Sequence, residues 1–243
     1  MELAEGERIE LDGRLNEEAW QRAAPAKDFI QIDPDNGKPA TEPTEVRLIY
    51  SREALYIGVT CHDSEPDKWL GYQRRRDEFL SSDDRFMWTI DTFLDGRSGY
   101  FFEMNPSGLM GDLLMGVGGV DKRQWDGIWN AHVERSEIGW TIEIEIPFRT
   151  LNFDPSADSW GINFQGTVRR RNEDSIWMGW ARNQGLRRMT NAGVVTGLKE
   201  MSQGLGLDVK PFLTVQGQSS PGRGNTETIR QQDVGVDVFY NLT

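Results

Sequence analysis

The sequence predicts an all-β protein, an antiparallel β-sandwich of the jelly-roll or immunoglobulin-like kind with one or two short helices. Apolar and polar residues alternate with a period of two through much of its 243 residues, which is typical of strands that bury one face. Turn-forming residues such as those at 33–37 and 105–108 separate the alternating runs. Long helical patterns between the runs are missing, which argues against alternating strands and helices.

The run at 140–146 shows the alternation clearly. One face carries Trp140, Ile142, Ile144 and Ile146, and the other carries Thr141, Glu143 and Glu145. We expect the first face in the core and the second in solvent. Comparable apolar alternation occurs at 46–50, 55–61, 86–90, 100–104 and 162–168.

Helix is expected in two short places. Residues 15–20 form the better candidate, with Asn16 as its N-cap and Pro25 preventing its continuation. A further turn is expected close to Pro147. The single cysteine, Cys61, excludes an internal disulfide and is expected in the core.

The character of the sequence changes after residue 200. We therefore divide the chain into a sandwich domain at 1–200 and a tail at 201–243. In the tail, alternating residues near 205–209 and 234–240 predict one or two extra strands, and the Gly, Ser, Gln and Asn residues at 216–226 predict a flexible linker. Such alternation is also the pattern of an outer-membrane barrel strand.

The charge of the chain limits its partners. A net charge of −12 argues against nucleic-acid binding, which needs a basic surface. The basic runs at 74–76 and 169–171 are interpreted as solvated strand ends or partners of acids, with an anion or uronate site as the alternative. Met1 is followed at once by domain-like sequence without a signal peptide, so the protein is cytosolic or the sequence is a piece of a longer precursor.

Several motifs occur in an order that resembles a known family. They are IELDGRLNEEAW, TEVRLIYSREALYIGVTCHD, SSDDRFMWTIDTFLDGRSGYFFEMNPSG, GWTIEIEIPFRTLNF and WGINFQGTVRRRNE, spread over residues 8–198. Together they resemble the family 9 carbohydrate-binding modules, within the wider group of DOMON-like sandwiches. The resemblance implies a non-catalytic module that binds a polysaccharide or oligosaccharide, attached to or acting beside a glycoside hydrolase.

A narrower likeness concerns the tail. The stretches WDGIWNAHV, GLDVKPFLTV and GVDVFYNLT resemble a bacterial group that joins such a module to a C-terminal outer-membrane β-barrel. This implies an exported protein of the periplasm or cell surface that starts before Met1 and continues past Thr243. It also leaves an alternative function, a structural or gating domain of the barrel without a sugar site.

The sequence departs from the family at its sugar site. In sugar-binding members two tryptophans clamp the sugar ring, and counting from Asp84 and Gly193 places these positions near Ser81 and Leu186. Neither residue is aromatic, so the clamp is not carried over. Substitute platforms are predicted in two loops, although these aromatic residues could equally close the ends of the sandwich. The candidate carbohydrate-binding residues are Trp125, Asp126, Trp129, Trp69, Tyr72 and Arg74.

Two further sets of residues are candidates for a metal ion or a cofactor. Family members often carry structural calcium, and Asp77, Asp83 and Asp84 supply the hard oxygen ligands that it prefers. Zinc is disfavoured by one cysteine and two separated histidines. A second alternative function is a haem-carrying redox domain, with axial ligands from Met104, Met110, Met115 and His132.

Catalysis receives little support from the sequence. Glu143 and Glu145 share a strand face, but we interpret them as a solvated face rather than as a hydrolytic pair. Nucleophile elbows and phosphate-binding loops are absent from the sequence. We therefore expect a binding or accessory domain and no enzyme.

Overall fold

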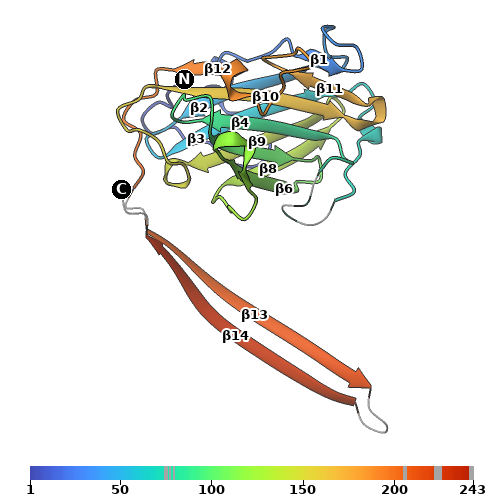
Figure 1. Cartoon of the computed structure of the whole chain (residues 1–243), viewed down its shortest axis with the longest axis vertical. Coiled ribbons are helices and arrows are strands. Elements are labelled where there is room, and N and C mark those ends of the chain that lie inside the picture. The colour runs from blue at the N-terminus through green and yellow to red at the C-terminus, as the bar shows by residue number, and fades with distance from the viewer. Residues whose placement is uncertain (74–75, 77, 79, 205–206, 222–225, 241–243) are drawn as a thin grey trace. The chain divides into compact units, whose positions relative to one another are not determined.

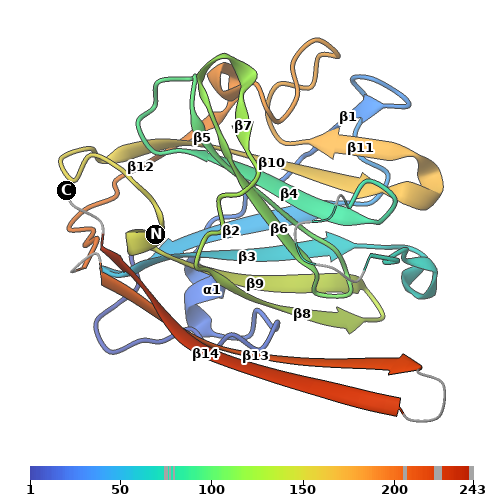
Figure 2. The ribbon, with the colours of Figure 1, turned by 60° about the horizontal axis from the view of Figure 1, so that its bottom comes forward.

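The structure is a computed structural model of the chain. It describes residues 1–243 except 74–75, 77, 79, 205–206, 222–225 and 241–243; between 207 and 240, side chains are described for 234–236 only. The described residues form two compact units, Met1–Ser202 and Gln203–Thr243. Two antiparallel sheets face each other in the first unit (Figures 1 and 2), which confirms the predicted β-sandwich.

The larger sheet has eight described strands in the order β1-β11-β10-β4-β5-β6-β7, with β12 paired to β10. The smaller sheet has the order β2-β3-β9-β8. The strands of the larger sheet are β1 (Ile30–Asp33), β4 (Arg85–Asp91), β5 (Gly99–Met104), β6 (Met110–Met115), β7 (Asp121–Lys122), β10 (Ser159–Val168), β11 (Glu173–Ile176) and β12 (Gly193–Thr196). Those of the smaller sheet are β2 (Thr44–Tyr50), β3 (Ala54–His62), β8 (Asn130–Ser136) and β9 (Gly139–Pro147).

The main core fills the space between the two sheets. Trp88 of β4 stacks on Phe102 of β5 at 5.2 Å between ring centroids. From the other sheet, Ile57 of β3 lies opposite Ile144 of β9, and both are fully buried in the same cluster. Cys61 is also buried there, as expected. The period-two alternation of the sequence therefore identified the inward faces correctly.

The short helices lie close to where the sequence placed them. Helix α1 spans Glu18–Arg22, and its N-cap is Glu17 without a side-chain capping bond. The prediction that Asn16 caps it was wrong, since the helix begins one residue later. The turn expected near Pro147 is the 3-10 turn η3 (Phe148–Thr150). The other 3-10 turns are η1 (Pro66–Lys68), η2 (Val117–Gly119), η4 (Arg169–Arg171) and η5 (Met189–Asn191).

Glu143 of β9 is fully buried, which corrects the expectation that it faces solvent. The N-terminal segment covers this face of the smaller sheet. The carboxylate of Glu143 accepts hydrogen bonds from three donors in that segment, Trp20 Nε1 and the backbone N–H groups of Asp12 and Gly13, each at 2.9 Å. A distant segment thus buries a residue whose local pattern indicated exposure, and Glu143 serves as its anchor.

The second unit is a long β-hairpin. Strand β13 (Leu207–Pro221) pairs antiparallel with β14 (Thr226–Tyr240), from the pair Leu207–Tyr240 to the pair Pro221–Thr226. The two strands form a sheet of their own (Figure 1). The predicted flexible linker at 216–226 was wrong for 216–221 and 226, which pair as strand, and 222–225 lie outside the described residues. Whether this unit begins a barrel stays a prediction.

Burial of Glu143 predicts a pH dependence of stability. Burial raises its pKa from 4.5 to about 7, against the opposing hydrogen bonds from Trp20, Gly13 and Asp12. A raised pKa in the folded state means that the stabilisation is complete below pH 4.5 and is lost as the pH rises through 7. We expect Glu143 to contribute a fall in the free energy of unfolding on the order of 2 kcal/mol over that window.

Denaturant unfolding at pH 4.5, 6 and 7.5 measures this fall. The Glu143→Gln variant is expected to be less stable than the parent. Its free energy of unfolding should also fall less between pH 4.5 and 7.5, because the titrating carboxyl is gone. Glu145→Gln, two residues along the same strand face, is the matched control and should show the same fall as the parent. An equal fall for the parent and Glu143→Gln would contradict the assignment.

Candidate functional site

The candidate site lies on the outer face of the larger sheet. Strand register places residues of one parity side by side there: Met87 of β4 lies between Glu103 of β5 and Gln165 of β10. Phe101 of β5 lies opposite Leu113 of β6. An outer sheet face is ordinarily polar, but three of these residues, Met87, Phe101 and Leu113, are large and apolar.

A loop covers part of this apolar face. Leu186 and Met189 are buried in a second hydrophobic cluster together with Met87, Phe101 and Leu113. The backbone oxygen of Leu186 also accepts a hydrogen bond from Thr89 Oγ1 at 3.4 Å. The cover is incomplete, and it leaves a cavity between loop and sheet.

The cavity has a volume of about 470 Å³, within the range of small-molecule sites. Its lining combines apolar and polar side chains, which is the composition expected of a small-molecule site. Gly111 leaves room for the Glu103 side chain, because a Cβ at residue 111 would lie 3.2 Å from Glu103 Cγ. The lining residues are Ser81, Arg85, Met87, Phe101, Glu103, Gly111, Asp112, Leu113, Arg123, Gln165, Gln184, Gly185, Leu186 and Arg187.

This cavity is called the cleft below. Its polar groups include a nearly buried ion pair. Arg85 Nη1 donates to Glu103 Oε2 at 2.9 Å, and the two side chains are 18% and 9% exposed. Burial raises the pKa of Glu103, and the charges of Arg85 and Arg123 oppose that rise. Arg85 Nε is buried without a hydrogen-bond partner, so this pair presents a donor that a ligand oxygen could satisfy.

Asp112 connects the cleft to the neighbouring loop. Its fully buried carboxylate accepts hydrogen bonds from Trp129 Nε1 at 2.8 Å and from Gly127 N–H at 3.2 Å. It also pairs with Arg76 Nη2 at 2.8 Å. Arg76 reaches Asp126 as well, at 3.0 Å. The carboxylate therefore fixes loop 125–129 against the edge of the sheet.

The Trp125 and Trp129 platform predicted from the sequence is not formed. Trp129 is 4% exposed and packs edge-on against Trp88 and Phe102, each at 5.4 Å, so neither face of its ring is open to a sugar. Trp125 is half-buried against Tyr100 at 5.0 Å. Asp126 is exposed but paired with Arg76. These residues lie beside the cleft, at Asp112, and close the end of the sandwich.

The second predicted platform is only partly open. Trp69 is half-buried, with the guanidinium of Arg135 over its ring at 4.7 Å. Tyr72 is 68% exposed. Arg74 lies outside the described residues. None of the described members of this group lines the cleft.

The carboxylate of Asp83, the first predicted calcium ligand, is occupied by hydrogen bonds. Asp83 is fully buried, and four donors use the roughly four acceptor positions of a carboxylate. Those donors are the N–H groups of Tyr72 and Gln73, Asn105 Nδ2 and Ser82 Oγ. Among the described residues, no group of three His, Cys, Asp or Glu side chains is placed to hold a metal ion.

Asp84, the second predicted calcium ligand, also acts as an anchor for two backbone segments. Its two oxygens accept N–H hydrogen bonds from Leu70 at 2.8 Å and from Arg169 at 2.6 Å. Burial raises the pKa of Asp84 against these two hydrogen bonds. The third predicted ligand, Asp77, lies outside the described residues.

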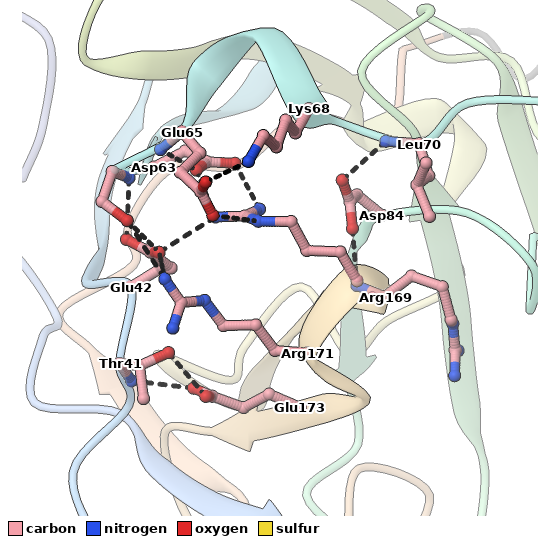
Figure 3. A network of polar contacts seen from close by, with 12 residues as sticks. Thr41, Glu42, Asp63, Glu65, Lys68, Leu70, Asp84, Arg169, Arg171 and Glu173 are labelled. Carbon is pink, nitrogen blue, oxygen red and sulfur yellow. Dashed lines mark hydrogen bonds and ion pairs between the residues drawn. The ribbon is translucent and has the colours of Figure 1, made fainter.

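Two residues of the basic run at 169–171, Arg170 and Arg171, pair with acids, as the first interpretation of the run held, whereas Arg169 Nε is buried without a hydrogen-bond partner. Arg170 binds the carboxylates of Asp63 and Glu42, and Arg171 reaches Glu42 at 2.8 Å. Figure 3 shows Arg171 directed towards Glu42, with Asp63 and Glu65 close by. Because the guanidinium groups of Arg170 and Arg171 are matched by internal carboxylates, these two arginines serve to fix η4.

The methionine and histidine haem ligands predicted from the sequence lie on different sheets. Met104 is opposite Met110 of β6, and Met115 is buried in the second hydrophobic cluster. Met104 is fully buried in the core on β5, in the larger sheet. His132 is exposed on β8, in the smaller sheet.

In the part of the chain that the structure describes, no helix is long and apolar enough to cross a membrane.

Sequence reasoning missed most of the residues that line the cleft. Arg85, Glu103 and Gln165 lie on outward faces that we left without a role, and Arg187 lies in a loop without a motif. One signal did point to the place. Ser81 and Leu186, the positions reached by counting to the missing clamp tryptophans, both line the cleft.

The fold and the cleft together define a β-sandwich with a small-molecule-sized cavity on the outer face of its larger sheet. No family model matches the sequence, and no curated protein matches it. Solved structures do match, and they show that the chain has the fold of the family 9 carbohydrate-binding modules.

Two of those structures are of a family 9 module from Caldicellulosiruptor kristjanssonii. Its complex with cellotriose aligns with a TM-score of 0.58 and 14% identity over 83% of this chain and 94% of that chain. Its complex with glucose gives 0.58 and 13% over 81% and 94%. A candidate carbohydrate-binding protein from Bacteroides uniformis gives 0.55 and 14% over 70% and 86%.

The burial of Trp129 predicts that its replacement damages stability. Trp129→Ala removes a buried indole and leaves Asp112 without one donor, so we expect a loss of about 3–5 kcal/mol in the free energy of unfolding. Trp125→Ala is the comparison, and its half-buried ring should cost about half as much. Urea unfolding measures both. A fully stable Trp129→Ala variant would show that the ring is not part of the core.

Proposed function

We propose that the first unit, Met1–Ser202, is a non-catalytic carbohydrate-binding module that holds an oligosaccharide in the cleft on the outer face of the larger sheet. The observation that carries the proposal is the cleft itself, lined by Ser81 and Leu186 where the resembling family holds its sugar clamp. The shared fold supports it, because solved modules of that fold were determined with cellotriose and with glucose. In this proposal the module belongs to an exported bacterial protein and assists polysaccharide breakdown.

The chemistry of the cleft suits a ligand rich in hydroxyl groups. Met87, Phe101 and Leu113 provide an apolar floor for the C–H face of a sugar ring. Gln165 is partly exposed at the cleft, and its side-chain amide has no hydrogen-bond partner among the described residues. An amide can both donate to and accept from a hydroxyl group, so Gln165 is suited to read one.

The carboxylates of the cleft favour binding over hydrolysis. A glycosidase needs one carboxylic acid to give a proton and a second carboxylate to act opposite it. Here Glu103 is tied to Arg85, and Asp112 is tied to Trp129, Gly127 and Arg76. Both groups are occupied by internal partners, which supports the absence of catalysis in the proposal.

Replacement of Gln165 tests the cleft as the binding site. Calorimetry of the parent with cello-oligosaccharides and a panel of other oligosaccharides should identify a ligand. Gln165→Ala should weaken its binding about three- to tenfold, since one or two neutral hydrogen bonds are lost. Ser81→Trp, which adds an aromatic ring at an exposed edge of the cleft, should strengthen binding of a neutral sugar by stacking.

Two exposed aromatic residues outside the cleft serve as controls. Trp180 is 46% exposed and Tyr72 is 68% exposed, and neither lines the cleft. Trp180→Ala and Tyr72→Ala should bind with the affinity of the parent. If either control abolishes binding while Gln165→Ala does not, the site lies elsewhere and the cleft proposal fails.

A second candidate function arises from the hairpin of the second unit. Strands β13 and β14 have 15 residues each and pair only with each other among the described strands. A two-stranded sheet is marginally stable alone in water, and Val234 and Val236 are 79% and 56% exposed on one of its faces. These features favour a structural role for the second unit beside an outer-membrane barrel.

Comparison of the whole chain with residues 1–202 separates these roles. If the hairpin associates with a membrane, the whole chain should float with vesicles of outer-membrane lipid and the 1–202 fragment should stay in solution. Val234→Asp with Val236→Asp should release the whole chain from the vesicles, since charge is disfavoured on a lipid-facing strand surface. Flotation of neither chain would count against the structural role.

A further inference from the structure

A second cavity adjoins the cleft. It has a volume of about 440 Å³ and shares Gln184 and Arg187 with the cleft, so the two cavities adjoin at these residues. At its edge, Gly96 has a φ of +67°, and a Cβ there would lie 2.8 Å from Thr190 Cγ2. Glycine at 96 therefore lets this segment pack closely against Thr190. The lining residues are Gly96, Asn183, Gln184, Arg187, Arg188, Met189 and Thr190.

The second cavity has cationic side chains and no acidic ones in its lining. Arg187 and Arg188 supply two guanidinium groups, and the remaining lining residues are uncharged. Arg187 is held in place, since it pairs with Asp121 and lies over the Phe101 ring at 5.9 Å. Arg188 is exposed, and its side chain has no ion pair or hydrogen bond among the described residues.

This local charge is opposite to that of the chain. The sequence contains 39 acidic and 27 basic residues, whereas the linings of the two cavities together contain four arginines and two acids. Both of those acids are buried and ion-paired, Glu103 with Arg85 and Asp112 with Arg76. The exposed charge at the junction of the cavities is therefore carried mainly by arginine.

We propose that the second cavity is a subsite for the carboxylate of an acidic sugar, with Arg188 as its main ligand and Arg187 beside it. The inference rests on the proposed function, because the cleft must hold the neighbouring ring of the same oligosaccharide. A guanidinium presents paired N–H donors that match the two oxygens of a carboxylate. The ligand class is then an oligosaccharide that contains uronic acid.

The missing clamp is consistent with this chemistry. Ser81 cannot stack on a sugar, and Leu186 is an aliphatic residue of the loop that is buried against the sheet. Affinity must then come from polar contacts, and a charge-assisted hydrogen bond is about twice as strong as a neutral one. A carboxylate on the ligand would thus replace part of what an aromatic clamp supplies.

Calorimetry on the whole chain with three trisaccharides tests the subsite. The probes are trigalacturonate, its fully methyl-esterified form and a sulfated galactose trisaccharide. Trigalacturonate should bind about tenfold more tightly than its ester, since the ester removes the charge and leaves the ring unchanged. Arg188→Gln should abolish that difference by weakening trigalacturonate alone, while the matched control Arg182→Gln, which lines neither cavity, should not alter it.

The outcomes that overturn the inference differ from those that overturn the proposed function. Equal binding of the acid and the ester, or an unchanged preference in Arg188→Gln, overturns the carboxylate subsite and leaves the cleft intact. Tighter binding of the sulfated probe with the same dependence on Arg188 also overturns it, because the anionic group would be a sulfate ester. If no saccharide of any kind binds, the proposed function fails as well.

Discussion

The packing of Leu186 and Met189 onto the outer face of the larger sheet is the contact on which the candidate site depends. A sandwich normally leaves that face to water, but here Met87 and Phe101 are apolar and need cover. Burying such a side chain stabilises a fold by about 1.5–3 kcal/mol, which is enough to hold a loop. Since the loop covers only part of the face, the uncovered part becomes a cleft with an apolar floor.

The sandwich itself was predictable because strand faces are encoded locally. Alternation within five to seven residues placed Trp88, Phe102 and Ile144 inward, and all three are fully buried. The errors arose where a distant segment decides burial. Glu143 has the alternation of a solvent-facing residue, but residues 12–20 cover it. In the tail, backbone pairing with β14 made strand of residues whose composition indicated a linker.

The site was harder to predict than the fold because its residues share no local motif. They come from four strands and several loops between 81 and 187, and only the register of the sheet brings them together. Aromatic residues in a glycine-rich loop were a misleading guide, since Trp129 fills the core. Counting to the clamp positions led to Ser81 and Leu186, which line the cleft, although it could not reveal the arginine and glutamine residues that line it with them.

The acidic composition of the chain explains why those arginines matter. Many of its carboxylates serve as internal acceptors: Asp83 and Asp84 hold the loop before β4, and Glu42 and Asp63 hold η4 through Arg170. Acids used in this way do not project charge into a ligand site, because their partners compensate them. Arg188 stands in the opposite situation, exposed at the mouth of a cavity whose lining contains no acid. In the proposed subsite, a negatively charged ligand group would therefore bind Arg188. A positively charged group would meet only carboxylates that already pair with arginines, Glu103 and Asp112.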